Sequence, residues 1–213
     1  MADFQHLPHF TTSAEVEHLR GLVGAHQDLF RETRSPANIG PRYRVIHGGQ
    51  IRARLPELLT WSEQRIRPVV EQFAGEPLEP MRDVTRAIRI QVFAGPHHGF
   101  RWHFDGDSYA ALLTLENTNG GQTHLIGAAL SRVVRPLFYP LYWAPQLFSL
   151  LPHRTFEMPA GDLLILHGTR LLHRGVCQHD GGQRLVVAFG YDEVGKRPNP
   201  LRERFARYVN FTE

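Results

Sequence analysis

The segment GDLLILHGTRLLHRGVCQHDGGQRLVVAFGYD, residues 161–192, consists of three short apolar runs separated by turn-forming residues. Each run has the length and the Leu, Ile and Val content of a β-strand. The sequence Asp180, Gly181, Gly182 predicts a tight turn between the last two runs. The segment therefore predicts short strands that pair in an antiparallel sheet.

Two regions upstream show the same two-residue period. Residues 86–95, RAIRIQVFAG, place Ile88, Ile90 and Val92 on one face and Arg89, Gln91 and Phe93 on the other. The second face suits solvent and a polar barrel interior equally well. Residues 110–126, AALLTLENTNGGQTHLI, predict a strand, a glycine-containing turn and a second strand.

The first third of the chain is predicted to be helical. Thr12 and Glu15 form a capping-box pattern at the start of a helix within residues 11–30. A second helix is expected within residues 56–75, where Pro68 would kink or divide it and Gly75 would end it.

Helices followed by many short strands indicate a mostly β fold with N-terminal helices. We expect a jelly-roll core, that is, a double-stranded β-helix, buttressed by those helices. A chain of 213 residues predicts a single domain over 1–213, with a mainly helical part at 1–80 and the jelly-roll core at 85–192. The hydrophobic segment 127–155 would be an insertion that serves as a lid or substrate wall.

Composition excludes several classes of function. The net charge is +3 and the arginines are scattered, so no basic stripe indicates nucleic-acid binding. Cys177 is the only cysteine, which rules out an intrachain disulfide and a cysteine-rich zinc site. The apolar residues 136–151 include three prolines and predict no membrane span. The first residues show no signal-peptide pattern, so a cytoplasmic protein is expected.

The segment RWHFDGD, residues 101–107, contains the most suggestive polar residues. If residues 101–105 form a strand, Arg101, His103 and Asp105 share one face. Trp102 and Phe104 then share the other face and can pack in a hydrophobic layer. Burying a cation, an imidazole and a carboxylate together is costly without a metal, a partner or water. We therefore expect this face to line a pocket inside the barrel.

A metal site needs a further ligand, and two histidines are candidates. His167 and His173 both lie in the strand-rich segment, but only His173 has an arginine eleven residues later, Arg184, across the predicted turn. Two histidines and one carboxylate leave coordination positions open and suit non-haem Fe(II).

With these residues, the chain resembles the Fe(II)/2-oxoglutarate-dependent oxygenases over residues 85–192. The resemblance is carried by the H-x-D pair, a distal histidine and a basic residue about ten positions beyond it, together with the GG-x-T segment at 120–123. It implies that His103, Asp105 and His173 are the catalytic iron ligands and that Arg184 binds 2-oxoglutarate, with O2 as the second cosubstrate. Many family members have a serine at the position of Val186, and we expect Thr114 to supply the missing hydroxyl.

The resemblance implies an oxygenase reaction with release of succinate and CO2, and the compactness of the chain leads us to expect hydroxylation of a small metabolite. Arg101, with Arg89 or Gln91, would anchor an acidic or amino-acid-like substrate, because a buried guanidinium needs an anionic partner. Pairing of Arg101 with a protein carboxylate such as Asp107 is the alternative. A protein or peptide hydroxylase, and a cupin-like metal-binding protein without turnover, remain alternative functions. A homodimer is left open.

Overall fold

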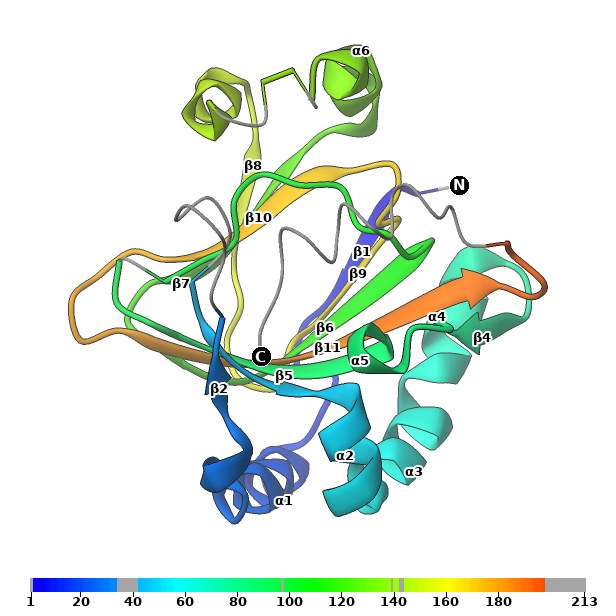
Figure 1. Ribbon diagram of the computed structural model, residues 1–213, viewed down its shortest axis with the longest axis vertical. Coiled ribbons are helices and arrows are strands. Elements are labelled where there is room, and N and C mark those ends of the chain that lie inside the picture. Colours follow the sequence, from blue (N-terminus) through cyan, green and yellow to red (C-terminus); the bar gives the residue numbers. More distant parts are fainter. Residues whose placement is uncertain (1, 34–41, 97, 139, 142–143, 198–213) are drawn as a thin grey trace.

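The computed structural model describes residues 2–33, 42–96, 98–138, 140–141 and 144–197 (Figure 1). Two antiparallel sheets face each other. The main sheet has eight strands, in the order β1-β9-β6-β11-β5-β3-β2, and β4 pairs with β11. Its strands are β1 (Phe4–Leu7), β2 (Arg31–Glu32), β3 (Arg44–His47), β4 (Leu78–Pro80), β5 (Ile88–Ala94), β6 (Tyr109–Thr118), β9 (Leu163–Leu166) and β11 (Gln183–Glu193). The minor sheet has the order β10-β7-β8, with β7 (Gly121–Ile126), β8 (Arg154–Glu157) and β10 (Leu172–Cys177).

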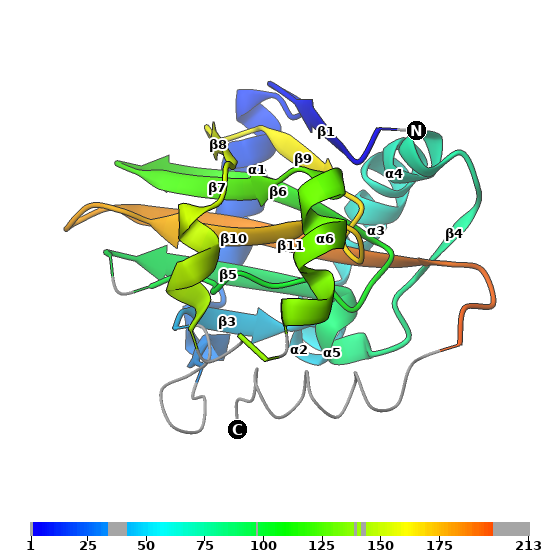
Figure 2. The same ribbon diagram turned by 90° about the horizontal axis from the view of Figure 1, so that it is seen from above.

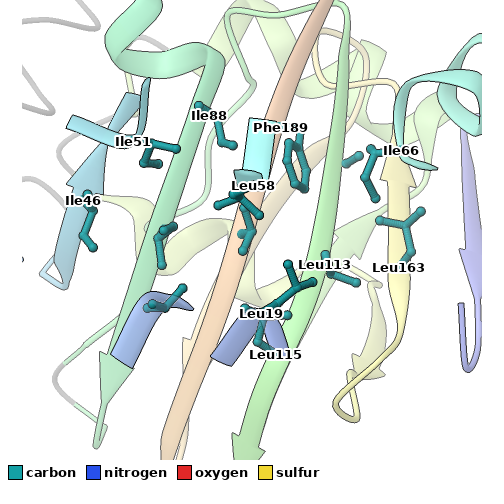
Figure 3. Close-up of a cluster of buried hydrophobic side chains, with 14 of the residues drawn as sticks. Leu19, Ile46, Ile51, Leu58, Ile66, Ile88, Leu113, Leu115, Leu163 and Phe189 are labelled. Atoms are coloured by element: carbon teal, nitrogen blue, oxygen red, sulfur yellow. The ribbon is translucent and has the colours of Figure 1, made fainter. Parts of the chain in front are cut away.

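Helices cover the outer face of the main sheet (Figure 1). They are α1 (Ser13–Gly24), α2 (Gly48–Arg54), α3 (Pro56–Arg65) and α4 (Arg67–Ala74), with the short η1 (Gln27–Leu29) and α5 (Val84–Ala87) beside them. Their apolar sides and the outward side chains of the sheet form the largest hydrophobic core, shown in Figure 3 around Leu58, Leu113 and Phe189. This core leaves the inner face of the sheet available for other side chains.

The predicted helix boundaries are largely confirmed. Thr12 caps α1, since its side chain accepts from the Glu15 amide while the Glu15 carboxylate accepts from the Thr12 amide. The helix predicted within residues 56–75 is divided into α3 and α4, with Pro68 in the first turn of α4. Proline is tolerated there because first-turn amides have no helical acceptor. Gly75 ends α4 with φ 74°, a conformation that favours glycine.

Strand β5 confirms the predicted alternation and decides between its two interpretations. Ile88, Ile90 and Val92 join the core beneath the helices. Gln91 and Phe93 are buried on the opposite, inner face, so this face is barrel interior and not solvent-exposed surface. The two strands predicted within residues 110–126 are also present, as β6 and β7, but they belong to different sheets and do not pair with each other.

The segment 127–155 contains α6 (Ala128–Phe138) and the short η3 (Pro145–Leu150). Both lie on the side of the minor sheet that faces away from the main sheet (Figures 1 and 2). Val134, Phe138 and Phe148 of this segment form a second hydrophobic cluster with Trp102 and Leu172. Tyr142 and Trp143 of the same segment lie outside the described residues. Among the described helices, none has the length and apolar character needed to cross a membrane.

Replacing Thr12 with alanine should lower the free energy of unfolding by about 1 kcal/mol, because the capping bond to the Glu15 amide is lost. Urea denaturation followed by circular dichroism measures this change. Thr60→Ala is a matched control, since the Thr60 hydroxyl only bonds back to the Pro56 carbonyl within α3. Equal losses in both variants would contradict the capping role.

Candidate metal centre and its cavity

Three side chains converge between the two sheets. The Nε2 atoms of His103 and His173 lie 3.3 Å and 3.2 Å from the two carboxylate oxygens of Asp105. One ligand atom from each of these residues lies within 4.8 Å of the others, so a single ion can contact all three. The structure thus brings together the three residues that the sequence singled out and selects His173 over His167.

Backbone pairing sets the positions of the two histidines. His103 and His173 form an isolated bridge in which each amide donates to the other's carbonyl, at 2.9 Å and 3.0 Å. The Asp105 amide donates to the Gly168 carbonyl at 3.0 Å. Residues 101–105 do not form the regular strand that was considered, since only this bridge at His103 is assigned to them. The predicted alternation nevertheless holds, because Trp102 and Phe104 pack on the opposite side in the second hydrophobic cluster.

Both histidines are held in the tautomer that a metal requires. The Nδ1 atom of His103 lies 2.8 Å from the Arg101 carbonyl oxygen, and that of His173 lies 3.1 Å from the Leu171 carbonyl oxygen. A carbonyl only accepts, so each Nδ1 carries the proton. Each Nε2 therefore presents a lone pair toward Asp105, which is the usual arrangement of histidine ligands.

Electrostatics maintain a charged carboxylate at this site. Burial would raise the pKa of Asp105, but His173 and His103 hold it well below its usual range. Burial and the neighbouring His173 lower the pKa of His103, so its imidazole stays neutral. Burial alone would lower the pKa of His173, yet the Asp105 carboxylate raises it.

Gly168 makes room for the carboxylate. A Cβ added at Gly168 would lie 2.7 Å from the Asp105 Cβ and 3.0 Å from the Asp107 carbonyl oxygen. Both distances are too short for carbon, so any larger residue displaces the loop that carries Asp105.

The three residues line a cavity of about 510 Å³, a volume that includes the solvent-filled space at its entrance. Its floor is formed by the inner faces of β5, β6 and β11, and its roof by β7, β10 and the His103 segment. The lining residues are Arg89, Gln91, Phe93, Phe100, His103, Asp105, Asp107, Ala110, Leu112, Thr123, His173, Gly175, Arg184, Val186, Ala188 and Phe189. The cavity is therefore mixed in polarity, with aromatic rings near the metal cluster and cations on the floor.

Arg184 is the most unusual residue of this cavity. Only 2% of its surface is exposed. It donates to the Gln122 carbonyl and to the Thr123 hydroxyl, both at 2.9 Å, while its Nε has no hydrogen-bond partner. Within the described residues it forms no salt bridge. Burial lowers the pKa of Arg184 to about 10, so the side chain remains charged at neutral pH without a counterion.

The remaining predicted site residues are distributed around this cavity. Arg89 and Gln91 line it, and the Gln91 Nε2 is buried without a hydrogen-bond partner. Thr114 lies opposite Val186 on the neighbouring strand and is fully buried, but it is not among the lining residues. Arg101 is not among them either, although its carbonyl orients His103.

Thr123 is a cavity residue that the sequence analysis passed over. It lies in the GG-x-T segment that carried part of the resemblance, so a signal for it was present. His167 lies apart from the metal cluster, with its ring 4.7 Å from that of Tyr109. None of the described residues of the insertion lines the cavity, and those residues provide no lid or wall.

Comparison with protein-family models finds no match, and neither does comparison with curated protein sequences. Solved structures do match. SnoN, a non-heme alpha-ketoglutarate-dependent epimerase from nogalamycin biosynthesis, is 18% identical with a TM-score of 0.69, over 99% of this chain and 84% of its own. HygX from Streptomyces hygroscopicus, solved with nickel and 2-oxoglutarate bound, is 17% identical with a TM-score of 0.68, over 92% and 85%. A Pseudomonas putida prolyl-4-hydroxylase is 17% identical with a TM-score of 0.58, over 91% and 94%.

These similarities show that the chain has the double-stranded β-helix fold of the 2-oxoglutarate-dependent oxygenases. The predicted fold class is therefore confirmed.

His173→Ala should abolish high-affinity binding of Fe(II) or Co(II), while His167→Ala should leave it intact. The reason is that His173, unlike His167, points its Nε2 at Asp105. Anaerobic titration followed by calorimetry measures the affinity. If His167→Ala lost metal binding and His173→Ala kept it, the distal ligand would be His167.

Gly168→Ala should weaken metal binding strongly, because the added methyl group displaces Asp105 or the Asp107 carbonyl. Gly49→Ala is the control, since a Cβ there meets open space within α2. The same titration compares them, and wild-type affinity in the Gly168 variant would mean that the loop relaxes without cost.

Proposed function

We propose that the protein is an Fe(II)- and 2-oxoglutarate-dependent oxygenase. The observation that carries this proposal is the buried, uncompensated Arg184 in the same cavity as a two-histidine, one-carboxylate cluster. A buried cation without a counterion is strongly unfavourable, so the site is built for an anion that arrives from outside. An oxygenase of this class combines these two features because its cosubstrate is a dicarboxylate.

The donor set fits iron. Two neutral imidazole nitrogens and one carboxylate leave coordination positions open for further ligands, which is the arrangement preferred by non-haem Fe(II). His103, Asp105 and His173 would hold the ion. When bound, iron supplies the activation of O2 that side chains alone cannot perform.

The cation fits 2-oxoglutarate. Arg184 would bind the distal carboxylate through charge-assisted hydrogen bonds, which are shorter and stronger than neutral ones. Thr123 orients the guanidinium through the bond to its Nη2. Thr114 lies beside Val186 with an unpartnered hydroxyl, which supports its proposed contribution to the same carboxylate.

The protein's own residues would orient the reactants and exclude water. Phe100 stacks on the His103 ring with 4.9 Å between ring centroids, and the Phe93 ring lies 5.9 Å from that of Phe100. These apolar rings shield the metal cluster, which strengthens the electrostatic interactions within it.

For the substrate, we favour a small acidic or amino-acid-like metabolite, hydroxylated with release of succinate and CO2. Support comes from the Gln91 Nε2 and the Arg89 Nε, which are buried and lack hydrogen-bond partners. These two residues line the cavity and Arg101 does not, so they are the stronger candidates for anchoring an anion. Among the similar structures, HygX has been solved with hygromycin B and SnoN with nogalamycin RO.

Incubation with Fe(II), O2 and 2-oxoglutarate should yield succinate, at a slow uncoupled rate until a substrate is supplied. Mass spectrometry of the reaction measures it. A cupin-like binding protein would bind metal and form no succinate. If succinate formation is stimulated by a protein extract depleted of metabolites, and not by the metabolite fraction, a protein or peptide substrate would be favoured instead.

Arg184→Ala should raise the apparent Michaelis constant for 2-oxoglutarate roughly 30-fold or more, because loss of a charge-assisted partner costs about 2–5 kcal/mol. Metal affinity should be unchanged, since Arg184 does not contact the cluster residues. Arg132→Ala on the exposed surface of α6 is the control. An unchanged constant in the Arg184 variant would place the anion site elsewhere.

Arg89→Met and Gln91→Leu should weaken binding of the accepted substrate while leaving 2-oxoglutarate affinity intact. Arg101→Met serves as the comparison, because it tests the candidate that lies outside the lining. Substrate dependence of succinate formation measures all three. If only Arg101→Met weakens substrate binding, Arg101 anchors the substrate, and Arg89 and Gln91 have another role.

A further inference from the structure

The segment that carries His103 has little regular structure of its own. It meets β10 through two isolated bridges, one between Gly99 and Val176 and one between His103 and His173, with the Phe100 amide bonded to the Gly175 carbonyl between them. Two segments joined by so few hydrogen bonds do not by themselves fix the relative orientation of two side chains. Further contacts are made by the neighbours of the histidines, namely Trp102 and the two residues that flank His173.

Ser149 of η3 bonds to both polypeptide segments at once. Its hydroxyl accepts from the Trp102 Nε1 at 3.0 Å and from the Arg174 Nη1 at 3.1 Å. Trp102 directly precedes His103, and Arg174 directly follows His173. One hydroxyl of the insertion therefore links the immediate neighbours of both proposed iron ligands.

Ser131 of α6 makes a second link. Its hydroxyl donates to the Ile126 carbonyl at 2.8 Å and accepts from the Leu172 amide at 3.1 Å. Leu172 directly precedes His173, so the insertion bonds to β10 on both sides of the distal ligand. Ser131 is fully buried, which means that water does not replace either bond.

The Arg174 side chain is further fixed by its other contacts. Its guanidinium lies 4.9 Å from the ring centroid of Trp102, a cation–π contact. Its Nε and Nη2 lie 3.2 Å and 3.1 Å from the His124 Nδ1. Arginine only donates, so His124 accepts at Nδ1 as a neutral ring. Burial, Arg174 and His153 lower the pKa of His124 to about 4, which agrees with that neutral form.

We infer that Ser149 and Ser131 are positioning residues, and that the insertion is a clamp that sets the relative orientation of His103 and His173 from behind the minor sheet. This inference rests on the proposed metal site. The clamp acts through Trp102, Leu172 and Arg174, none of which belongs to the ligand set. It also gives the insertion a role although its described residues lie outside the cavity.

The test compares Ser149→Thr, which keeps the hydroxyl, with Ser149→Val, which has nearly the same shape without it. Co(II) replaces iron, because its visible ligand-field bands report the arrangement of the ligands. We expect the valine variant to bind Co(II) roughly tenfold more weakly, the low end of the range for outer-shell partners, and to shift the bands. The threonine variant should retain wild-type affinity and bands. Ser62→Ala is the control, because Ser62 is a buried serine of α3 that bonds only to the Leu59 carbonyl.

A second measurement separates failure of the clamp from failure of the metal site. In the metal-free protein, the ring nitrogen signals of His103 and His173 in nuclear magnetic resonance spectra should move in Ser149→Val and in Ser131→Ala, and stay in place in Ser149→Thr and Ser62→Ala. Unmoved ring signals in the valine variant, or equal Co(II) affinity in the threonine and valine variants, would overturn the clamp. Absence of Co(II) binding by the wild type, with moved ring signals, would overturn the metal site alone.

Discussion

The reciprocal pair of backbone hydrogen bonds between His103 and His173 is the constraint on which the site depends. It brings a segment between two strands of the main sheet against β10 of the minor sheet, so that residues seventy positions apart present their Nε2 atoms to one carboxylate. Each Nδ1 is occupied by a backbone carbonyl, which fixes the tautomer. The backbone thus fixes the positions and tautomers of the two histidines before an ion is present, and this preorganisation reduces the conformational cost of binding.

The fold can maintain such a polar interior because its stability comes from elsewhere. The largest core lies on the other side of the main sheet, beneath α1 to α4, where β3, β5, β6, β9 and β11 contribute buried apolar side chains. The inner face can then carry Arg184, Gln91 and Arg89, whose unpartnered atoms cost free energy. A ligand that supplies partners for these atoms would recover that cost. Stability and ligand binding are therefore assigned to opposite faces of the same strands.

Sequence patterns predicted the parts of the molecule that local rules control. The capping box at Thr12, the division of a helix at Pro68 and the alternation in β5 each depend on a few neighbouring residues. The sequence favoured His173 over His167 only through its spacing to Arg184. The physical reason is the register of β10, which local patterns do not contain. The irregular backbone around His103 was missed because side chains can alternate between two faces without forming a regular strand. Thr123 was missed because its importance comes from Arg184, which lies on another sheet.

The insertion shows how a segment outside the cavity can still matter to it. Its apolar side chains bury Trp102 and Leu172, which hydrophobicity alone explains. Hydrophobic packing is non-directional, however, and does not specify how two histidine rings meet. The hydrogen bonds of Ser131 and Ser149 are directional, and they end on the residues next to those rings. A serine that only needed to be buried would be replaced without loss by alanine, whereas a serine that orients its partners would not.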